Sequence, residues 1–173
     1  MYGKSVNLPL SLPSLLSNNT YMREKIEILF EEVKKLEKKS NLSASASHAS
    51  ANEASGGLAA SYSAAGDAEH SRNTANLSMQ KYQSIKKLSE ELREASYQDN
   101  PQSAKTPCYI LLQIGGDPEK EVYLVENPVF ISGFNMVSPV SPIGNALMGH
   151  KAGDLFLYTS GGQTFTGKVL EIG

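Results

Sequence analysis

Apolar residues in the first part of the chain recur at helical spacing. Between residues 20 and 40 the apolar positions are four, three, four and three residues apart, and lysine and glutamate fill most of the rest: Met22, Ile26, Leu29, Val33 and Leu36. This heptad-like seam predicts an amphipathic helix with one narrow apolar stripe. Asn19 or Thr20 is suited to cap its start.

A second helix is predicted over residues 67–96. Its apolar positions also keep helical spacing: Met79, Tyr82, Ile85, Leu88, Leu92 and Ala95. At 1.5 Å per residue this helix would span about 45 Å, which is longer than one small core requires. Two long helices with one narrow stripe each most simply pair as an antiparallel hairpin, so we predict a coiled coil over residues 20–97.

Residues 41–66, between the two helices, are mostly alanine, serine and glycine, with no lysine or arginine and Glu53 as the only acidic residue. Alanine favours extension of both helices, whereas Gly56, Gly57 and the serines favour a break or a mobile tip. We therefore assign this stretch to the tip region of the hairpin. A disordered low-complexity linker is the alternative.

The pattern changes after residues 98–107, whose two prolines and polar residues indicate a linker. Four short runs rich in β-branched, aromatic and leucine residues follow, separated by glycine, aspartate and proline: 109–114, 121–125, 154–158 and 164–172. They predict a small, mostly antiparallel sheet. Residues 141–148 predict a short helix with Pro142 in its first turn. The fold class is thus α+β, a helical hairpin followed by a β domain over residues 108–173.

The N-terminus and the composition narrow the setting. Residues 1–19 are apolar in part but interrupted by prolines, which favours an extended arm over a signal peptide or membrane span. The formal net charge is −2, and Cys108 is the only cysteine. A disulfide framework and a cysteine-rich zinc site are therefore excluded, and a reduced, cytoplasmic setting is expected. The oligomeric state stays open.

The C-terminal sequence resembles a known family. The run from Ser138 to Asp154, SPVSPIGNALMGHKAGD, is followed by TSGGQ from Thr159 and by VLEI from Val169. This order of turns is similar to the C-terminal domain of the GreA/GreB transcript-cleavage family. The resemblance implies an FKBP-like domain that docks on RNA polymerase at the rim of the secondary channel, and it implies five polymerase-binding residues: Ser141, Pro142, Ile143, Gly144 and Leu147.

The hairpin departs from the family's acidic tip. The stretch from Gly66 to Asn76 loosely resembles the family motif, with Asp67 and Glu69 as tip carboxylates. Their separation is two residues where the family has three, and on a helix this spacing directs side chains about 200° apart. If they sit in a turn, Asp67 would assist the polymerase Mg²⁺ and Glu69 would position or deprotonate water. Otherwise Asp67 is a helix N-cap and Glu69 a first-turn carboxylate.

These observations lead to one class of function with two branches. The first is an accessory factor, not an enzyme by itself, that stimulates cleavage of backtracked RNA by the polymerase. The second occupies the channel without restoring cleavage. No cofactor or stably bound metal of its own is expected, and DNA or RNA would be contacted only inside the elongation complex. Alternatives are a coiled-coil adaptor for another protein and, less favoured because aromatic residues are few, a prolyl isomerase.

Overall fold

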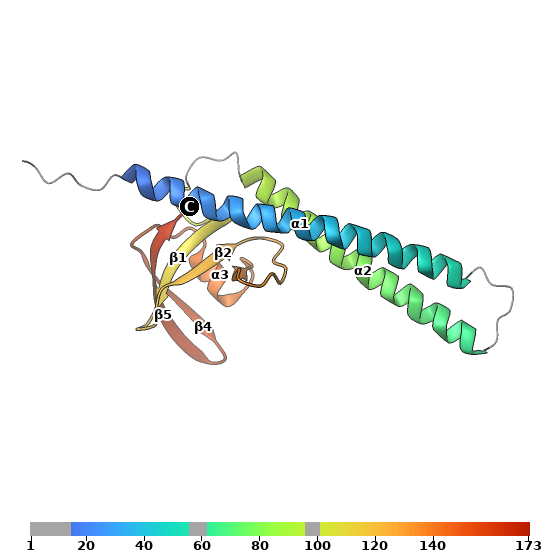
Figure 1. Ribbon diagram of the computed structural model, residues 1–173. Coiled ribbons are helices and arrows are strands. Elements are labelled where there is room, and N and C mark those ends of the chain that lie inside the picture. Colours follow the sequence, from blue (N-terminus) through green and yellow to red (C-terminus); the bar gives the residue numbers. More distant parts are fainter. Residues whose placement is uncertain (1–14, 56–61, 96–100) are drawn as a thin grey trace, which may run out of the picture.

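The computed structural model describes the backbone of residues 15–55, 62–95 and 101–173. Two long helices, α1 (Leu15–Ser55) and α2 (Tyr62–Ala95), form a hairpin that projects from a small sheet domain (Figure 1). The sheet domain contains β1 (Cys108–Ile114), β2 (Lys120–Leu124), β3 (Met136–Val137), α3 (Pro142–Leu147), β4 (Leu155–Ser160) and β5 (Gln163–Ile172). The α+β fold class predicted from the sequence is therefore confirmed. No helix of the described residues is long and apolar enough to cross a membrane.

The helices are longer than the apolar periodicity indicated. α1 begins at Leu15, so residues 15–19 are helical where we predicted an extended arm, and Asn19 and Thr20 lie inside the helix instead of capping it. The rest of the predicted arm, residues 1–14, lies outside the described residues. α1 continues to Ser55 and α2 begins at Tyr62, so most of the Ala/Ser-rich stretch is helix and not a mobile tip. The high helix propensity of alanine accounts for the difference.

The connection between the helices, residues 56–61, lies outside the described residues, as does the predicted break at Gly56 and Gly57. The outer hairpin, residues 40–55 of α1 and 62–78 of α2, contains small side chains at its buried positions: Ser40, Ala44, Ala51 and Ala75. Ser47 Oγ lies 3.4 Å from Ser78 Oγ across the seam. Small residues let the two helices pack closely, so the outer hairpin is slender.

The sheet has the strand order β3-β2-β1-β5-β4. β1 pairs antiparallel with β2 and β5, β4 pairs antiparallel with β5, and only the two-residue β3 runs parallel to its neighbour, β2. The sequence predicted the other four strands but not β3, because two residues are too short for a period of two to be visible. Because successive side chains of a strand point to opposite faces, β1 and β2 contribute to two different cores.

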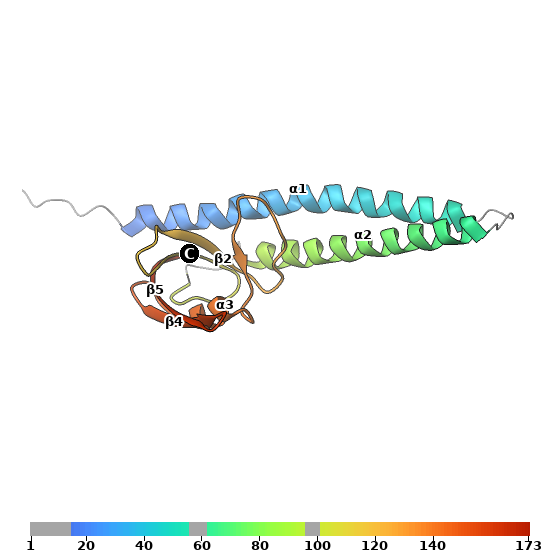
Figure 2. The same ribbon diagram turned by 90° about the horizontal axis from the view of Figure 1, so that it is seen from below.

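One core is shared by the hairpin and the sheet. We call it the shared core, and it consists of Ile26, Leu29 and Val33 of α1, Ile85, Leu88 and Leu92 of α2, and Tyr109, Tyr123 and Val125 of the sheet domain. The rings of Tyr109 and Tyr123 pack edge to face, with centroids 5.4 Å apart. The near end of the hairpin therefore lies against the sheet, as the view from below also shows (Figure 2).

Two polar contacts fix the edges of the shared core. Lys25 Nζ of α1 lies 2.6 Å from a carboxylate oxygen of Glu121 on β2. The Glu91 carboxylate of α2 accepts hydrogen bonds from the backbone N–H of Glu126 at 2.6 Å, and from the backbone N–H and the side-chain amide of Asn127, both at 3.2 Å. Each helix of the hairpin is thus tied separately to the sheet domain.

The opposite face of the sheet, to which Phe156 of β4 contributes, packs against α3. This second core contains Ala104, Cys108, Ile110, Leu112, Val122, Leu124, Leu147, Phe156 and Val169. α3 lies within the predicted range 141–148, with Ser141 as its N-cap, Pro142 in its first turn and Met148 as its C-cap. Gly161 and Gly162 have φ values of 59° and 79° and form the predicted two-residue turn between β4 and β5.

The shared core gives a test of how the hairpin is held. Leu88 is fully buried there, whereas Leu77 on the same helix is 66% exposed. We expect Leu88→Ala to lower the free energy of unfolding by about 2–5 kcal/mol, because it leaves a cavity between the helices and the sheet. Leu77→Ala is the matched control and should cost less than about 0.5 kcal/mol. Urea unfolding measures both, and equal losses would show that Leu88 is not part of a packed core.

Candidate functional sites

The two predicted tip carboxylates lie on α2 toward the outer end of the hairpin. Asp67 comes five residues after the first residue of the helix, Tyr62, and both Asp67 and Glu69 are exposed. The interpretation of Asp67 as an N-cap and of Glu69 as a first-turn carboxylate is therefore wrong. Because the backbone is helical at both positions, the two side chains project about 200° apart around the helix axis. They do not share a face and do not form a carboxylate pair.

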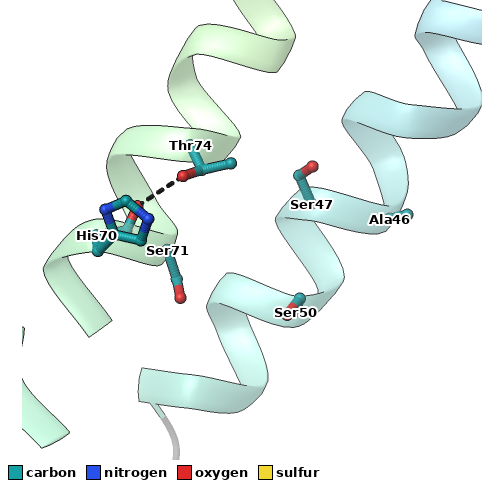
Figure 3. Close-up of a pocket in the computed structure, with 6 residues that line it drawn as sticks. All are labelled: Ala46, Ser47, Ser50, His70, Ser71 and Thr74. Carbon is teal, nitrogen blue, oxygen red and sulfur yellow. Dashed lines mark hydrogen bonds between the residues drawn. The ribbon is translucent and has the colours of Figure 1, made fainter. Parts of the chain in front are cut away.

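A shallow groove of about 420 Å³ lies between the helices close to these residues. Figure 3 shows its lining, with Ala46, Ser47 and Ser50 on α1 facing His70, Ser71 and Thr74 on α2. The Thr74 hydroxyl donates to the carbonyl oxygen of His70 at 2.9 Å. The lining contains hydroxyl groups and one imidazole but neither Asp67 nor Glu69.

The described part of the chain contains no cluster of side chains that could bind a metal ion. No three or more histidine, cysteine, aspartate or glutamate side chains gather there in a way that could hold an ion. Any role of Asp67 toward a metal would therefore need ligands from another molecule. A single carboxylate directed at a partner's Mg²⁺ can assist it but cannot hold it alone.

The second predicted site is at α3 in the sheet domain. The hydroxyl of Ser141 donates to the Ser138 carbonyl oxygen at 2.6 Å and accepts from the Gly144 N–H at 3.1 Å. Gly144 is buried, and a Cβ there would lie 2.0 Å from the Ser138 oxygen. Leu147 is fully buried and Ile143 packs partly against the second core. The helix and the turn that precedes it are therefore stabilised by four of the predicted residues: Ser141, Ile143, Gly144 and Leu147.

Of the five predicted polymerase-binding residues, only Pro142 is exposed. Two apolar neighbours that the sequence did not single out are exposed beside α3, Val140 at 89% and Met148 at 41%. Val140 stands between two Ser-Pro pairs, which turn the chain on both sides of it and direct it outward. That placement was the available signal in the sequence. A partner of this region would contact Val140, Pro142 and Met148.

The protein thus has two parts, a long helical hairpin and a five-stranded sheet domain to which the base of the hairpin is fixed. Comparison with protein families gives a match for the sheet domain. Residues 110–173 match the family described as transcription elongation factor GreA/GreB, C-terminal domain. The resemblance read from the sequence is thereby confirmed, and the chain is GreA/GreB-like through this domain. A comparison with curated proteins gives no match.

Several solved structures are similar. One is the prokaryotic transcription elongation factor GreA/GreB from Nitrosomonas europaea, with 24% identity, coverage of 51% of this chain and 77% of that chain, and a TM-score of 0.35. Another is the GreA factor homolog 1 (Gfh1) of Thermus thermophilus, with 14% identity, 83% and 94% coverage and a TM-score of 0.33. Gfh1 of Thermus aquaticus gives 16%, 83%, 92% and 0.34.

Gly144 tests whether the α3 motif acts as scaffold. We expect Gly144→Ala to lower the free energy of unfolding by about 1–3 kcal/mol, because the new methyl group meets the Ser138 carbonyl and forces the entry turn apart. Gly116→Ala is the control, since a Cβ at Gly116 meets nothing within 4 Å. Its effect should stay within about 0.5 kcal/mol. Thermal or urea unfolding of both variants gives the comparison, and an unchanged Gly144→Ala would refute the scaffold role.

Proposed function

We propose that this chain is a transcription elongation regulator that binds RNA polymerase at its secondary channel and extends the helical hairpin into the channel. The observation that carries the proposal is the GreA/GreB C-terminal domain over residues 110–173. The hairpin mounted on that domain supports it, because α1 has 41 residues and reaches about 60 Å. The exposed apolar residues Val140, Pro142 and Met148 are the proposed docking surface. This role places the protein in the cytoplasm with the polymerase.

We further propose that the bound protein occupies the channel without restoring RNA cleavage. Two-metal hydrolysis needs an oxygen ligand for the second Mg²⁺ and a group that orients the attacking water at the same point. Asp67 and Glu69 project to different sides of α2, so one of them faces away whenever the other faces the metal. The chain would then act by filling the channel, as an accessory factor without chemistry of its own.

Stimulation of cleavage is the second candidate function. It is favoured by the exposure of both carboxylates near the outer end of the hairpin. In that case Asp67 would assist the polymerase Mg²⁺ and Glu69 would act on water, which requires the helix around them to open into a turn so that both carboxylates meet at one point. Independent DNA binding is not proposed, because the segment from residue 104 onward contains four lysines, no arginine and six acidic residues.

A stalled, backtracked elongation complex tests the function. We expect the wild-type protein to bind the polymerase without shortening the RNA, and Asp67→Ala/Glu69→Ala to behave in the same way. His70→Glu creates a carboxylate three residues after Asp67, on the same side of the helix. This variant should shorten the RNA at least about tenfold faster than wild type, and His70→Gln should not. Shortening by the wild-type protein that disappears in the double alanine variant would establish the second candidate function.

Binding to the polymerase is measured separately with purified enzyme. Val140→Asp should weaken the affinity at least about tenfold, because it places a charge in the centre of an apolar contact. Thr164→Asp adds the same charge at an exposed position of β5 and should leave the affinity within about twofold. No binding by the wild-type protein would reject the proposed function as a whole and favour an adaptor for another protein.

A further inference from the structure

An apolar strip lies bare on β4, the strand at one end of the sheet. Leu155 and Leu157 are 68% and 64% exposed. Leu155 pairs with Lys168 of β5, and Lys168 pairs with Gln113 of β1, so these side chains share one face of the sheet. Tyr109 has the same parity on β1 as Gln113, and the hairpin covers it on that face. Within the described residues, the hairpin therefore covers this face at β1 and leaves it open at β4.

The backbone of β4 is also open on one side. β4 ends the strand order of the described sheet, so only its other side has a neighbouring strand, β5. The Val169 N–H donates to the Asp154 carbonyl oxygen at 2.9 Å, so the backbone of Asp154 is directed toward β5. Because this direction alternates along a strand, the N–H and C=O groups of Leu155, Leu157 and Thr159 point to the outer side. Bare apolar side chains and outward hydrogen-bonding groups therefore occur on the same short strand.

The sequence of β4 lacks the features that usually keep edge strands from pairing. Residues 155–160 read LFLYTS, without a charged residue or a proline. Their register with β5 runs without a bulge from Leu155 to Ser160. Native edge strands are commonly blunted by charges, prolines or bulges. The outer edge of β4 is therefore able to accept another strand.

A second copy of the chain supplies a matching strand. When two identical strands pair antiparallel, the outward residues of both copies form the hydrogen-bonded pairs and share one face. With Leu157 opposite its counterpart on the twofold axis, Leu155 lies opposite Thr159 of the second copy. The leucines of the two copies then form one continuous apolar strip. We propose that the chain forms a symmetric homodimer in which the two β4 strands pair antiparallel along their outer edges.

The charges around the edge favour a second copy over a charged segment of another protein. A symmetric contact brings equal charges together, but β4 is neutral and does not repel its own copy, and it offers a charged segment no opposite charge. Lys168 is on the same face, one strand away. Its two copies would lie about 14 Å apart along the strands and about 14 Å across them. This separation exceeds the Debye length of about 8 Å, so their repulsion is largely screened.

The hairpin does not obstruct the approach of a second copy. β4 lies on the side of the sheet domain that faces away from α1 in both views (Figures 1 and 2). β5 separates β4 from β1, the strand that α1 contacts. The twofold axis of such a pair is perpendicular to the sheet, so the two sheets join edge to edge. The two hairpins then lie on the same face of the joined sheet, toward its opposite ends.

Sedimentation of the full chain between about 1 and 500 µM tests the proposal. The contact is small, so we expect a dimer with a Kd on the order of 10–100 µM. Leu157→Asp sets two carboxylates against each other on the twofold axis and should weaken the dimer at least about tenfold. Leu77→Asp is the matched control, because Leu77 of α2 is also exposed, at 66%, and lies outside the sheet. It should change the Kd by less than about twofold.

Amide hydrogen exchange, followed by NMR, locates the contact. In the wild-type protein the N–H groups of Leu155 and Thr159 should become more protected as the protein concentration rises, because pairing with the second copy occupies them. Leu157→Asp should abolish this rise. The amide of Ile110 in the central strand reports whether the sheet itself is intact in each variant.

A wild-type protein that remains monomeric at about 500 µM would overturn the proposal. A dimer that Leu157→Asp leaves intact, or that Leu157→Asp and Leu77→Asp weaken equally, would also overturn it, because another surface would then form the contact. Protection of the β4 amides that does not depend on concentration would show that the same chain covers this edge. These outcomes do not depend on polymerase binding.

Discussion

The shared core between the hairpin and the sheet is the interaction on which the rest of this structure depends. It buries leucine, isoleucine and valine side chains from both helices against Tyr109 and Tyr123. Rotation of the hairpin relative to the sheet would expose these residues to water, and each buried aliphatic side chain contributes about 1.5–3 kcal/mol. The salt bridge of Lys25 and the hydrogen bonds of Glu91 lie at the border of this core. The base of the hairpin is therefore held in a fixed orientation relative to the sheet domain.

The base and the outer part of the hairpin differ in the size of their buried residues. Large apolar residues occur where the helices meet the sheet, and alanine and serine occur in the outer hairpin. A seam of small residues keeps the outer part thin but contributes little burial energy, so the outer part depends on helix propensity and on the base for its position. In our proposal, a narrow channel in the polymerase requires a thin rod whose direction is fixed at its base.

Periodic apolar patterns predicted much of this fold, because the physical cause of each element lies within a few residues. The seam residues Ile26, Leu29, Ile85 and Leu88 are buried as expected, and α3 begins at its Ser-Pro cap. The ends of the helices in the Ala/Ser-rich stretch were harder to predict, because alanine and serine show no apolar periodicity. There the helices continue because of helix propensity alone. The sequence could not indicate that Tyr109 faces the hairpin, because that contact joins residues distant in the chain.

The candidate sites were predicted less completely for a related reason. The motif at α3 predicted its helix, but it could not show that Gly144 and Leu147 are buried or that Val140 beside them is exposed. For Asp67 and Glu69 the sequence supplied the spacing, and the backbone conformation decided its meaning. Side chains two residues apart can converge in a turn and cannot do so on a helix. The structure thus shows which of the predicted residues are exposed and where they project, and their function stays a prediction.

The distance between the outer hairpin and the sheet domain tests the fixed base most directly. Spin labels at Asn73→Cys on α2 and Thr164→Cys on β5 occupy exposed positions. Burial raises the pKa of the only native thiol, Cys108, to about 12, so that residue should stay unlabelled. Pulsed electron resonance of the free protein should give one narrow distance distribution. A broad or two-peaked distribution would contradict the account, because it would show that the hairpin moves relative to the sheet.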